Sequence, residues 1–299
     1  MAINAISAEL LMLCRTLQPD AGSFLMLGRQ WLRLVPEEAS ALQARHGLHL
    51  EDLADAKRSD SVYAEPLLER LKFQQVESLD ATAYQGAGLV HDLNTPLPLE
   101  HHAKFDWVFD GGSLEHVFDF PTAIRNITAL LKPGGLFITM TPANNWMGHG
   151  FYQFSPELFY RAFCAEHGFR TRFAALVAHG PPPVFHALRD PAETGHRAQI
   201  NPPGRMSLLF VAEKLSATAS IKEVQQSDYS ARWKDGREKP ATSSAARKAP
   251  GGLKALIPAS LREKVSSWRI QRRRLQEGAR GMSRHESISS AWAAALASQ

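Results

Sequence analysis

The sequence has few cysteines and no long apolar runs. Cys14 and Cys164 are its two cysteines. Two thiols cannot build a disulfide framework or a cysteine metal cluster, so we expect a reducing compartment and two small, buried side chains. No stretch approaches the roughly 18 uninterrupted apolar residues that a membrane-spanning helix needs. The apolar segment Met1–Leu13 lacks a basic leader and a small-residue cleavage site, so it predicts a first helix and a cytoplasmic protein.

Glycine is scarce where one class of cofactor-binding enzymes requires it. Ser23–Gly28 reads SFLMLG, a short apolar run that predicts a buried strand ending in glycine. The residues that follow are Arg29, Gln30 and Trp31, so no G-x-G-x-x-G motif comes after the strand. This absence argues against a nicotinamide-dependent oxidoreductase.

The composition that remains is typical of a globular α/β chain, but its charge is uneven. The 299 residues are 44% hydrophobic and 21% charged, which leaves room for one sizeable domain and an appendage. Residues 216–299 hold 16 Lys plus Arg against 7 Asp plus Glu, whereas the whole chain carries +4. Residues 1–215 are therefore acidic. We predict a domain over 1–215 and a basic linker and tail over 216–299.

The most informative stretch is Phe105–Pro142. Phe105–Phe109 is a short apolar run before Asp-Gly-Gly, which predicts a buried strand and then a loop. From Phe120 to Leu131 apolar residues recur at three- and four-residue intervals, which predicts a helix that Lys132–Gly135 ends. Leu136–Met140 is again a strand-like apolar run. This order of strand, loop, helix, turn and strand is the βαβ unit of a parallel sheet.

Four segments of this stretch resemble a known family. They are FDWV at Phe105–Val108, LEHV at Leu114–Val117, LLKPGG at Leu130–Gly135 and LFITMTP at Leu136–Pro142. In this order they are similar to the second half of the domain of class I S-adenosylmethionine-dependent methyltransferases. The resemblance implies a Rossmann-like, doubly wound, mostly parallel seven-stranded sheet with helices on both faces. It also implies S-adenosyl-L-methionine as the cofactor.

The resemblance places the cofactor over the carboxyl ends of the first four strands. This sequence has Gly28 and then Arg29 where the family has a glycine-rich turn, and the guanidinium could bind the cofactor's carboxylate instead. Asp80, in the predicted second strand, is expected to accept hydrogen bonds from the ribose hydroxyls. Asp92 is expected to accept a hydrogen bond from the adenine amino group, and Leu93 is expected to pack on the adenine ring. An Asp at a strand end can also be only a turn former.

The loop after the fourth strand completes the expected cofactor site. Asp110 ends that strand, and Gly111 and Gly112 would let the backbone approach the cofactor closely. Glu115 and His116 follow. Some relatives use acids and a histidine near here as metal ligands, but one Glu and one adjacent His are too few for a site. We therefore expect hydrogen bonding and helix capping from them, and no required metal.

The loop after the fifth strand is the expected acceptor site, because it is rich in polar and aromatic groups. Asn144, Asn145, Trp146 and Tyr152 are predicted to bind the acceptor. Many members of the family have a histidine in this region, so His149 is the expected general base. The alternative is a loop histidine tied to the backbone.

The remaining segments bound the acceptor site and the tail. Residues 170–177 and 207–212 are predicted to be the sixth and seventh strands, and the proline-rich 180–204 between them an irregular excursion that forms one wall of the acceptor site. In the tail, residues 256–276 combine apolar and arginine positions as an interfacial basic helix does. Such a helix could bind an anionic membrane surface or an acidic partner, and nucleic acid less readily. We also expect a chain ending near Leu215 to fold independently.

Taken together, the residues predict a methyltransferase for a small-molecule or glycan-precursor acceptor. A second hypothesis is a non-catalytic binding or scaffolding protein that keeps the fold but has lost the cofactor. The replacement of the expected glycines by Arg29 and Gln30 favours the second hypothesis, whereas the retention of Asp80 and Asp92 favours the first.

Overall fold

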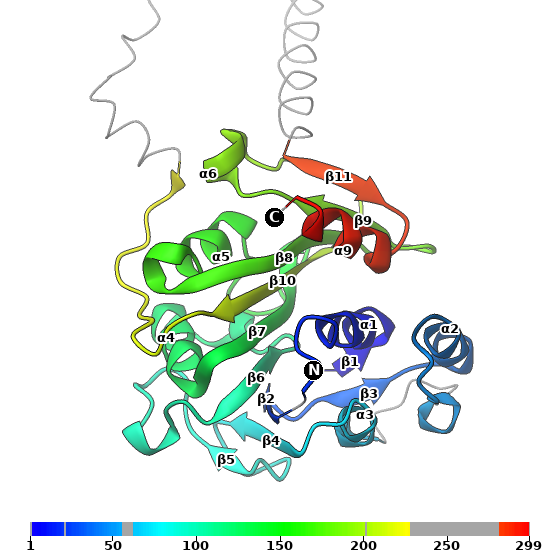
Figure 1. Ribbon diagram of the computed structural model, residues 1–299, viewed down its shortest axis with the longest axis horizontal. Helices are drawn as coiled ribbons and strands as arrows, with labels where there is room; N and C mark the ends of the chain where they lie inside the picture. The colour runs from blue at the N-terminus through cyan, green and yellow to red at the C-terminus, as the bar shows by residue number, and fades with distance from the viewer. Residues whose placement is uncertain (1, 21, 56–61, 201, 228–280, 299) are drawn as a thin grey trace, which may run out of the picture.

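The computed structural model describes residues 2–20, 22–55, 62–200, 202–227 and 281–298. A nine-stranded mixed sheet runs through the molecule and carries helices on both faces (Figure 1). Its parallel half consists, in spatial order, of β5 (Leu89–Val90), β4 (Gln75–Asp80), β2 (Ser23–Leu27), β6 (Phe105–Asp110) and β7 (Leu131–Asn144). Its antiparallel half continues with β10 (Met206–Lys214), β8 (Phe169–Ala178), β9 (Val184–Leu188) and β11 (Met282–His285).

The helices divide into two layers. One face carries α1 (Ala5–Cys14), α3 (Glu65–Arg70) and α9 (Ile288–Leu296), with α2 (Pro36–His46) packed against α1. The other face carries α4 (Phe120–Leu130) and α5 (Pro156–Ala162). A two-stranded parallel sheet of β1 (Ala2–Asn4) and β3 (Trp31–Arg33) lies beside the main one. The short elements are η1 (Glu51–Leu53), η2 (Leu99–His101), η3 (Leu114–His116), η4 (Ala165–His167) and α6 (Pro191–Thr194).

The apolar patterns explain why these segments take these positions. All five residues of β2 are buried, as expected of a central parallel strand covered on both faces. In α4 the side chain of Asp119 accepts a hydrogen bond from the Thr122 amide at 3.2 Å, which caps the helix start. The buried face of α4 includes Ile124, Ile127 and Leu130, so the periodic residues of the sequence form the core beneath the sheet.

The predicted strands and helices of the parallel half are confirmed, and the α/β fold with them, but the sheet is larger than expected. It has nine strands in the described residues where seven were predicted, and four of its eight pairings are antiparallel. The segment predicted to be an irregular excursion contains β9 and α6. Val184–Leu188 pairs with β8 and buries Phe185 and Ala187, so alternating apolar residues formed a strand despite the surrounding prolines.

The C-terminal residues also differ from the prediction. Sequence analysis placed them in a separate tail, whereas β11 pairs with β9, and α9 packs on the face that carries α1. Trp292 is only 4% exposed, and its ring lies 5.0 Å from that of Phe173. The Ser289 hydroxyl donates to Glu9 of α1 at 2.8 Å. Residues 282–296 are therefore part of the domain, because their apolar side chains complete its core.

Two further expectations concern the rest of that tail and the membrane. The predicted basic helix over 256–276 lies outside the described residues, so its partner stays a prediction. Among the helices that the structure describes, none combines the length and the apolar character that spanning a bilayer demands.

Candidate functional site

The expected cofactor residues converge at one edge of the parallel half. β2 has β4 on one side and β6 on the other, so the order of the strands along the chain reverses between β2 and β6. Open α/β sheets bind ligands at the carboxyl ends of the strands at such a reversal. The strand ends are aligned there, because Leu27 pairs with Leu79 and with Asp110. The loops that begin at Gly28 and Gly111 therefore lie on either side of the point where such a ligand would bind.

The loop after β2 is filled by its own side chains. Gly28 has a left-handed φ of +67°, and its amide donates to the Leu79 carbonyl at 2.7 Å. The Arg29 guanidinium donates to Glu65 at 2.7 Å and to the Gln85 carbonyl at 2.9 Å, and it lies 3.8 Å from the Tyr63 ring centre. Arg29 thus joins three segments of its own chain. Its predicted contact with a cofactor carboxylate stays a prediction.

Gln30 is a site residue that sequence analysis did not select. It is fully buried, and its Nε2 donates to the carbonyls of Leu27 and Gly28 at 2.9 and 3.0 Å. Its Oε1 is buried with no hydrogen-bond partner among the described residues. A Cβ added at Gly111 would lie 2.5 Å from this oxygen, so a side chain there would displace the Gln30 amide. The sequence signal for Gln30 was a polar residue placed two positions after Gly28, at the end of an apolar strand.

The two expected acids differ in how the protein uses them. Asp80 is half-buried at the end of β4, and in the described residues no hydrogen bond to its carboxylate is found. Asp92 is exposed and accepts from the backbone and side chain of Asn94 at 2.9 and 2.8 Å, and the backbone bond lowers the pKa of Asp92. Leu93 is 7% exposed and belongs to the core. Asp80 is therefore the carboxylate left available to a ligand.

Asp110 supports the loop after β6. It is fully buried, and its carboxylate accepts from the amides of Ser113 and Leu114 at 2.8 and 3.2 Å and from the Thr139 hydroxyl at 2.7 Å. Burial raises the pKa of Asp110, and these hydrogen bonds oppose the rise. The carboxylate thus holds the start of η3 in place and does not face a ligand.

Glu115, at the next turn, is a second buried acid. It is 1% exposed, and its Oε2 accepts from the Thr141 hydroxyl at 3.2 Å. Burial, and then the nearby charge of Asp110, raises the pKa of Glu115 to about 8. Its Oε1 lies 3.6 Å from Nε2 of His149, which follows β7. Strongly perturbed acids gather at functional sites, and this one faces the predicted acceptor loop.

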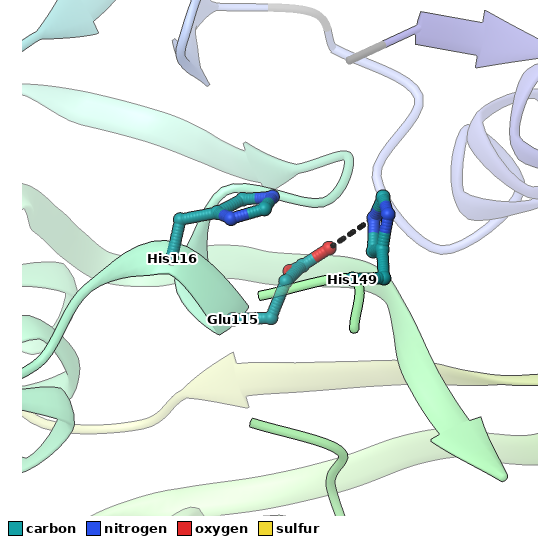
Figure 2. Close-up of side chains that lie close together, drawn as sticks. All are labelled: Glu115, His116 and His149. Atoms are coloured by element: carbon teal, nitrogen blue, oxygen red, sulfur yellow. Dashed lines mark ion pairs between the residues drawn. The ribbon is translucent and has the colours of Figure 1, made fainter. Parts of the chain in front are cut away.

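His116 completes a group of three potential ligands (Figure 2). One ligand atom each of Glu115, His116 and His149 lies within 4.8 Å of the others, and the two imidazole rings are 5.3 Å apart. Burial, and then His149, lowers the pKa of His116. Glu115 and His116 alone are too few ligands for a metal site. The fold adds His149, which lies 33 residues further along the chain than His116.

The predicted acceptor residues tie their loop to the proline-rich segment. Asn144 donates to the Ile200 carbonyl at 3.1 Å, Asn145 to that of Pro202 at 3.0 Å, and the Trp146 indole to that of Met206 at 2.6 Å. The Tyr152 hydroxyl donates to the Phe118 carbonyl at 2.6 Å. The loop and the wall expected of residues 180–204 therefore do lie together, but these four polar groups hold the protein to itself.

An apolar rim surrounds the same loop and was missed in the sequence. Phe118, Met147 and Phe151 are 72%, 91% and 68% exposed. The rings of Phe118 and Phe151 meet edge to face at 6.0 Å. Large exposed apolar side chains that gather in one place mark binding surfaces.

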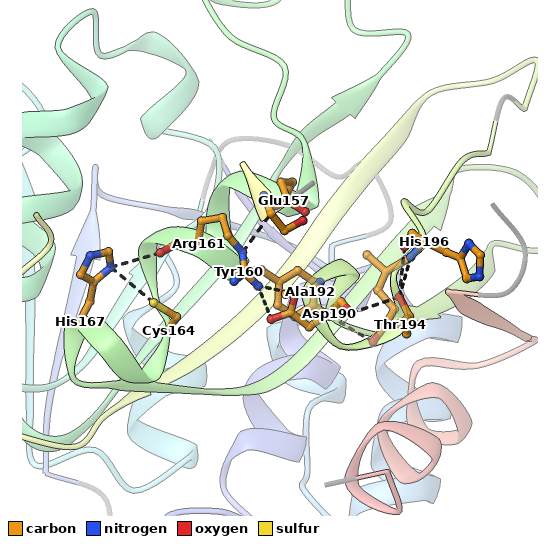
Figure 3. Close-up of polar contacts among 11 residues, drawn as sticks. Glu157, Tyr160, Arg161, Cys164, His167, Asp190, Ala192, Thr194 and His196 are labelled. Atoms are coloured by element: carbon orange, nitrogen blue, oxygen red, sulfur yellow. Dashed lines mark hydrogen bonds and ion pairs between the residues drawn. The ribbon is translucent and has the colours of Figure 1, made fainter. Parts of the chain in front are cut away.

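A hollow of about 1150 Å³ lies in the antiparallel half. Its lining includes Tyr160, Arg161, Asp190 and Ala294, and none of the predicted site residues. Arg161 donates to both carboxylate oxygens of Asp190, and the Tyr160 hydroxyl donates to the Leu188 carbonyl at 3.1 Å (Figure 3). Because Arg161 and Asp190 form an ion pair and the Tyr160 hydroxyl is hydrogen-bonded to the backbone, we place the functional site at the edge that carries Asp80 and Glu115.

Comparison with known proteins identifies a family for part of the chain. The family profile described as "Methyltransferase domain" matches residues 47–139. A search of the curated proteins finds no match to this sequence. Solved structures similar to the chain include the Burkholderia thailandensis 1,6-didemethyltoxoflavin-N1-methyltransferase, at 16% identity over 71% of this chain and 80% of that one, with a TM-score of 0.37.

A second similar structure is an S-adenosylmethionine-dependent methyltransferase from Thermotoga maritima, at 14% identity over 71% of this chain and 89% of that one, with a TM-score of 0.36. Structural similarity at this level adds little, so the assignment depends on the family match and the order of the strands. The match over residues 47–139 covers β4, β5, β6, α4 and most of the buried part of β7. By that match, residues 47–139 are assigned to the methyltransferase domain family.

Proposed function

We propose that the protein transfers a methyl group from S-adenosylmethionine to a small-molecule acceptor. The observation that carries the proposal is the convergence of groups that still need partners at the carboxyl edge of β2, β4 and β6. There the carboxylate of Asp80 has no described hydrogen bond, and Oε1 of Gln30 is buried without a donor. Buried polar groups without partners are rare in proteins and call for an explanation, such as a ligand.

The residues at this edge fit the chemistry of the cofactor. Asp80 can accept two hydrogen bonds from the ribose diol. Gly112, with a φ of +100°, adopts a left-handed backbone conformation that favours glycine. S-adenosylmethionine supplies an electrophilic methyl group, so the protein's task is to align the acceptor with it.

The acceptor would lie against the loop that carries His149. This side chain is 47% exposed, so it can reach an acceptor, and its pairing with Glu115 orients the ring. As a general base it would take a proton from an acceptor hydroxyl, a role worth about 10²- to 10⁴-fold in rate. The apolar rim of Phe118, Met147 and Phe151 favours an acceptor with an apolar or aromatic part.

Calorimetric titration with S-adenosylmethionine tests the proposal. We expect one cofactor per chain. Asp80→Ala should weaken binding by about 1.5–3 kcal/mol, the usual worth of hydrogen bonds to a charged group. Glu100→Ala is the matched control, because Glu100 is an exposed carboxylate of η2, which precedes β6 and so lies toward the opposite edge of the sheet. Unchanged affinity in folded Asp80→Ala would contradict the ribose assignment.

A scaffolding protein without cofactor is the second candidate. The observation that favours it is that Arg29 and Gln30 fill the loop after β2 and bind their own chain. If folded wild-type protein shows no heat of binding with S-adenosylmethionine or S-adenosylhomocysteine, this second function replaces the first.

A further inference from the structure

We infer that Glu115, His116 and His149 form a binding site for a divalent transition-metal ion, of which zinc suits the ligands best. The three side chains come from η3 and from the loop after β7, and they point toward one another (Figure 2). Their ligand atoms lie within 4.8 Å of one another. A shift of about 1 Å in two exposed imidazoles would bring all three to coordination distance of one ion.

The kind of ligands identifies the kind of metal. Two imidazoles and one carboxylate form a set that zinc and other first-row transition metals prefer, whereas magnesium and calcium prefer oxygen alone. Zinc sites with three protein ligands are of the catalytic kind, since structural sites use four. The remaining position is open to water or to a substrate.

The surroundings of the three ligands are prepared for an ion. Thr141 donates to Oε2 of Glu115, so Oε1 is left facing His149. In metal sites, a hydrogen bond to one carboxylate oxygen commonly orients the other oxygen toward the ion. A Cβ at Gly150 would lie 3.2 Å from Nδ1 of His116, and one at Gly112 would lie 3.1 Å from Oε1 of Glu115. Two glycines therefore keep side chains away from the ligand atoms.

The buried negative charge at this position is an independent reason to expect a metal ion. Glu115 is buried beside Asp110, which is also buried, and the hydrogen bonds to both carboxylates come from hydroxyl and amide groups. In the described part of the chain, His149 is the basic group found within ion-pair distance of Glu115. Buried carboxylates are generally paired with a cation or bound to a metal. A bound ion would supply the missing positive charge.

The position of the site suggests its use, and this extension rests on the proposed function. The ion would lie beside the acceptor loop, where it could bind an acceptor hydroxyl and lower the pKa of that hydroxyl. His149 would then hold the ion instead of acting as a free base. The binding of the metal itself does not depend on methyl transfer.

The test is a metal titration of the full chain, purified without a histidine tag and stripped with a chelator. Zinc is measured by calorimetry and cobalt by its visible absorption, which reports imidazole coordination. We expect one ion per chain. Glu115→Gln, His116→Ala and His149→Ala should each weaken zinc binding by more than about 100-fold, and Thr141→Val by about 10-fold. His102→Ala is the control, because it removes an exposed imidazole just before β6, at the opposite end of that strand.

Two results would overturn the inference: no stoichiometric binding of zinc or cobalt by folded wild-type protein, or equal zinc affinity in wild type and in Glu115→Gln and His149→Ala. Unfolding curves show that each variant is folded. Titration of the stripped protein with S-adenosylmethionine keeps the two proposals apart. Loss of cofactor binding with zinc binding intact would reject only the proposed function, and the reverse result would reject only the metal site.

Discussion

The two halves of the sheet use charged side chains in opposite ways. In the antiparallel half, Arg161 pairs with Asp190, and the buried His167 ring bonds the Ala162 carbonyl at 3.0 Å at the end of α5 (Figure 3). At the carboxyl edge of the parallel half, Glu115 is buried with one oxygen facing exposed imidazoles, and Gln30 has an oxygen without a donor. The antiparallel half pairs these charged groups within the chain, although Glu157 Oε2 and Arg161 Nε there have no hydrogen bond in the described part of the chain, whereas the parallel half buries an acid that faces two exposed imidazoles.

The difference separates structural polar groups from functional ones. A hollow of about 1150 Å³ lies in the antiparallel half, so the presence of a hollow does not by itself mark the functional site. Paired charges near a hollow stabilise the fold, whereas unpaired buried groups cost free energy that a ligand can recover. Substitutions in the two regions should therefore affect different measurements.

The largest effect is expected in the antiparallel half, at Trp292. Trp292→Ala should lower the free energy of unfolding by about 3–5 kcal/mol, because it empties a buried aromatic site of α9 against Phe173. Urea unfolding measures the change, and cofactor affinity should stay as in wild type. Trp292→Phe is the control and should recover most of the loss. If Trp292→Ala is as stable as wild type, α9 is not part of the core.

His149→Ala should have the opposite effect to Trp292→Ala: it should lower the rate of methyl transfer and leave stability almost unchanged. We expect the rate of methyl transfer to fall by about 10²- to 10⁴-fold, whether the ring acts as a base or holds a metal. The free energy of unfolding should change by less than about 0.5 kcal/mol, since the side chain is 47% exposed. Transfer of labelled methyl to a panel of hydroxylated aromatic acceptors measures the rate. A large loss of stability with little loss of rate would remove the contrast between the regions.

Arg161→Ala should lower the free energy of unfolding by about 2 kcal/mol. It leaves Asp190 without its main partner in a place where both side chains are about four-fifths buried. A double-mutant cycle with Asp190→Ala, followed by urea unfolding, isolates the pair. Cofactor and zinc affinities are the comparison, and neither should move. Any change in them would show that the two regions are coupled.

The smallest effect is expected at Arg29, which has structural contacts within the chain and a predicted contact with the cofactor. Arg29→Gly should weaken S-adenosylmethionine binding by about 1 kcal/mol if the guanidinium contacts the cofactor carboxylate. The substitution should also lower the free energy of unfolding, because Arg29 would no longer form its ion pair with Glu65 or its ring contact with Tyr63. Arg29→Lys keeps the charge and is the comparison variant. Tighter cofactor binding in Arg29→Gly would show that the side chain obstructs the site and would favour the scaffolding function.

Much of the parallel half could be predicted from the sequence because its information is local. The apolar run of β2 and the three- and four-residue spacing of α4 each depend on a few neighbouring residues. The predicted turn at Lys132–Gly135 lies instead inside β7, which begins at Leu131 directly after α4. α9 also carries a local signal: Ser287 precedes Ile288 as a helix cap, and apolar residues recur with helical spacing after it. β11 carried no such signal, since MSRH has no apolar alternation and became a strand only by pairing with β9.

The sequence by itself determined the α/β order, the family resemblance and the loops that hold the site. Only the tertiary structure decided that Glu115, His116 and His149 meet, that Gln30 fills the loop after β2, and that β11 and α9 complete the sheet and core. Local patterns depend on the backbone's period and on burial, which neighbouring residues reveal. Contacts between distant residues depend on strand register and on loop paths, which no local pattern encodes.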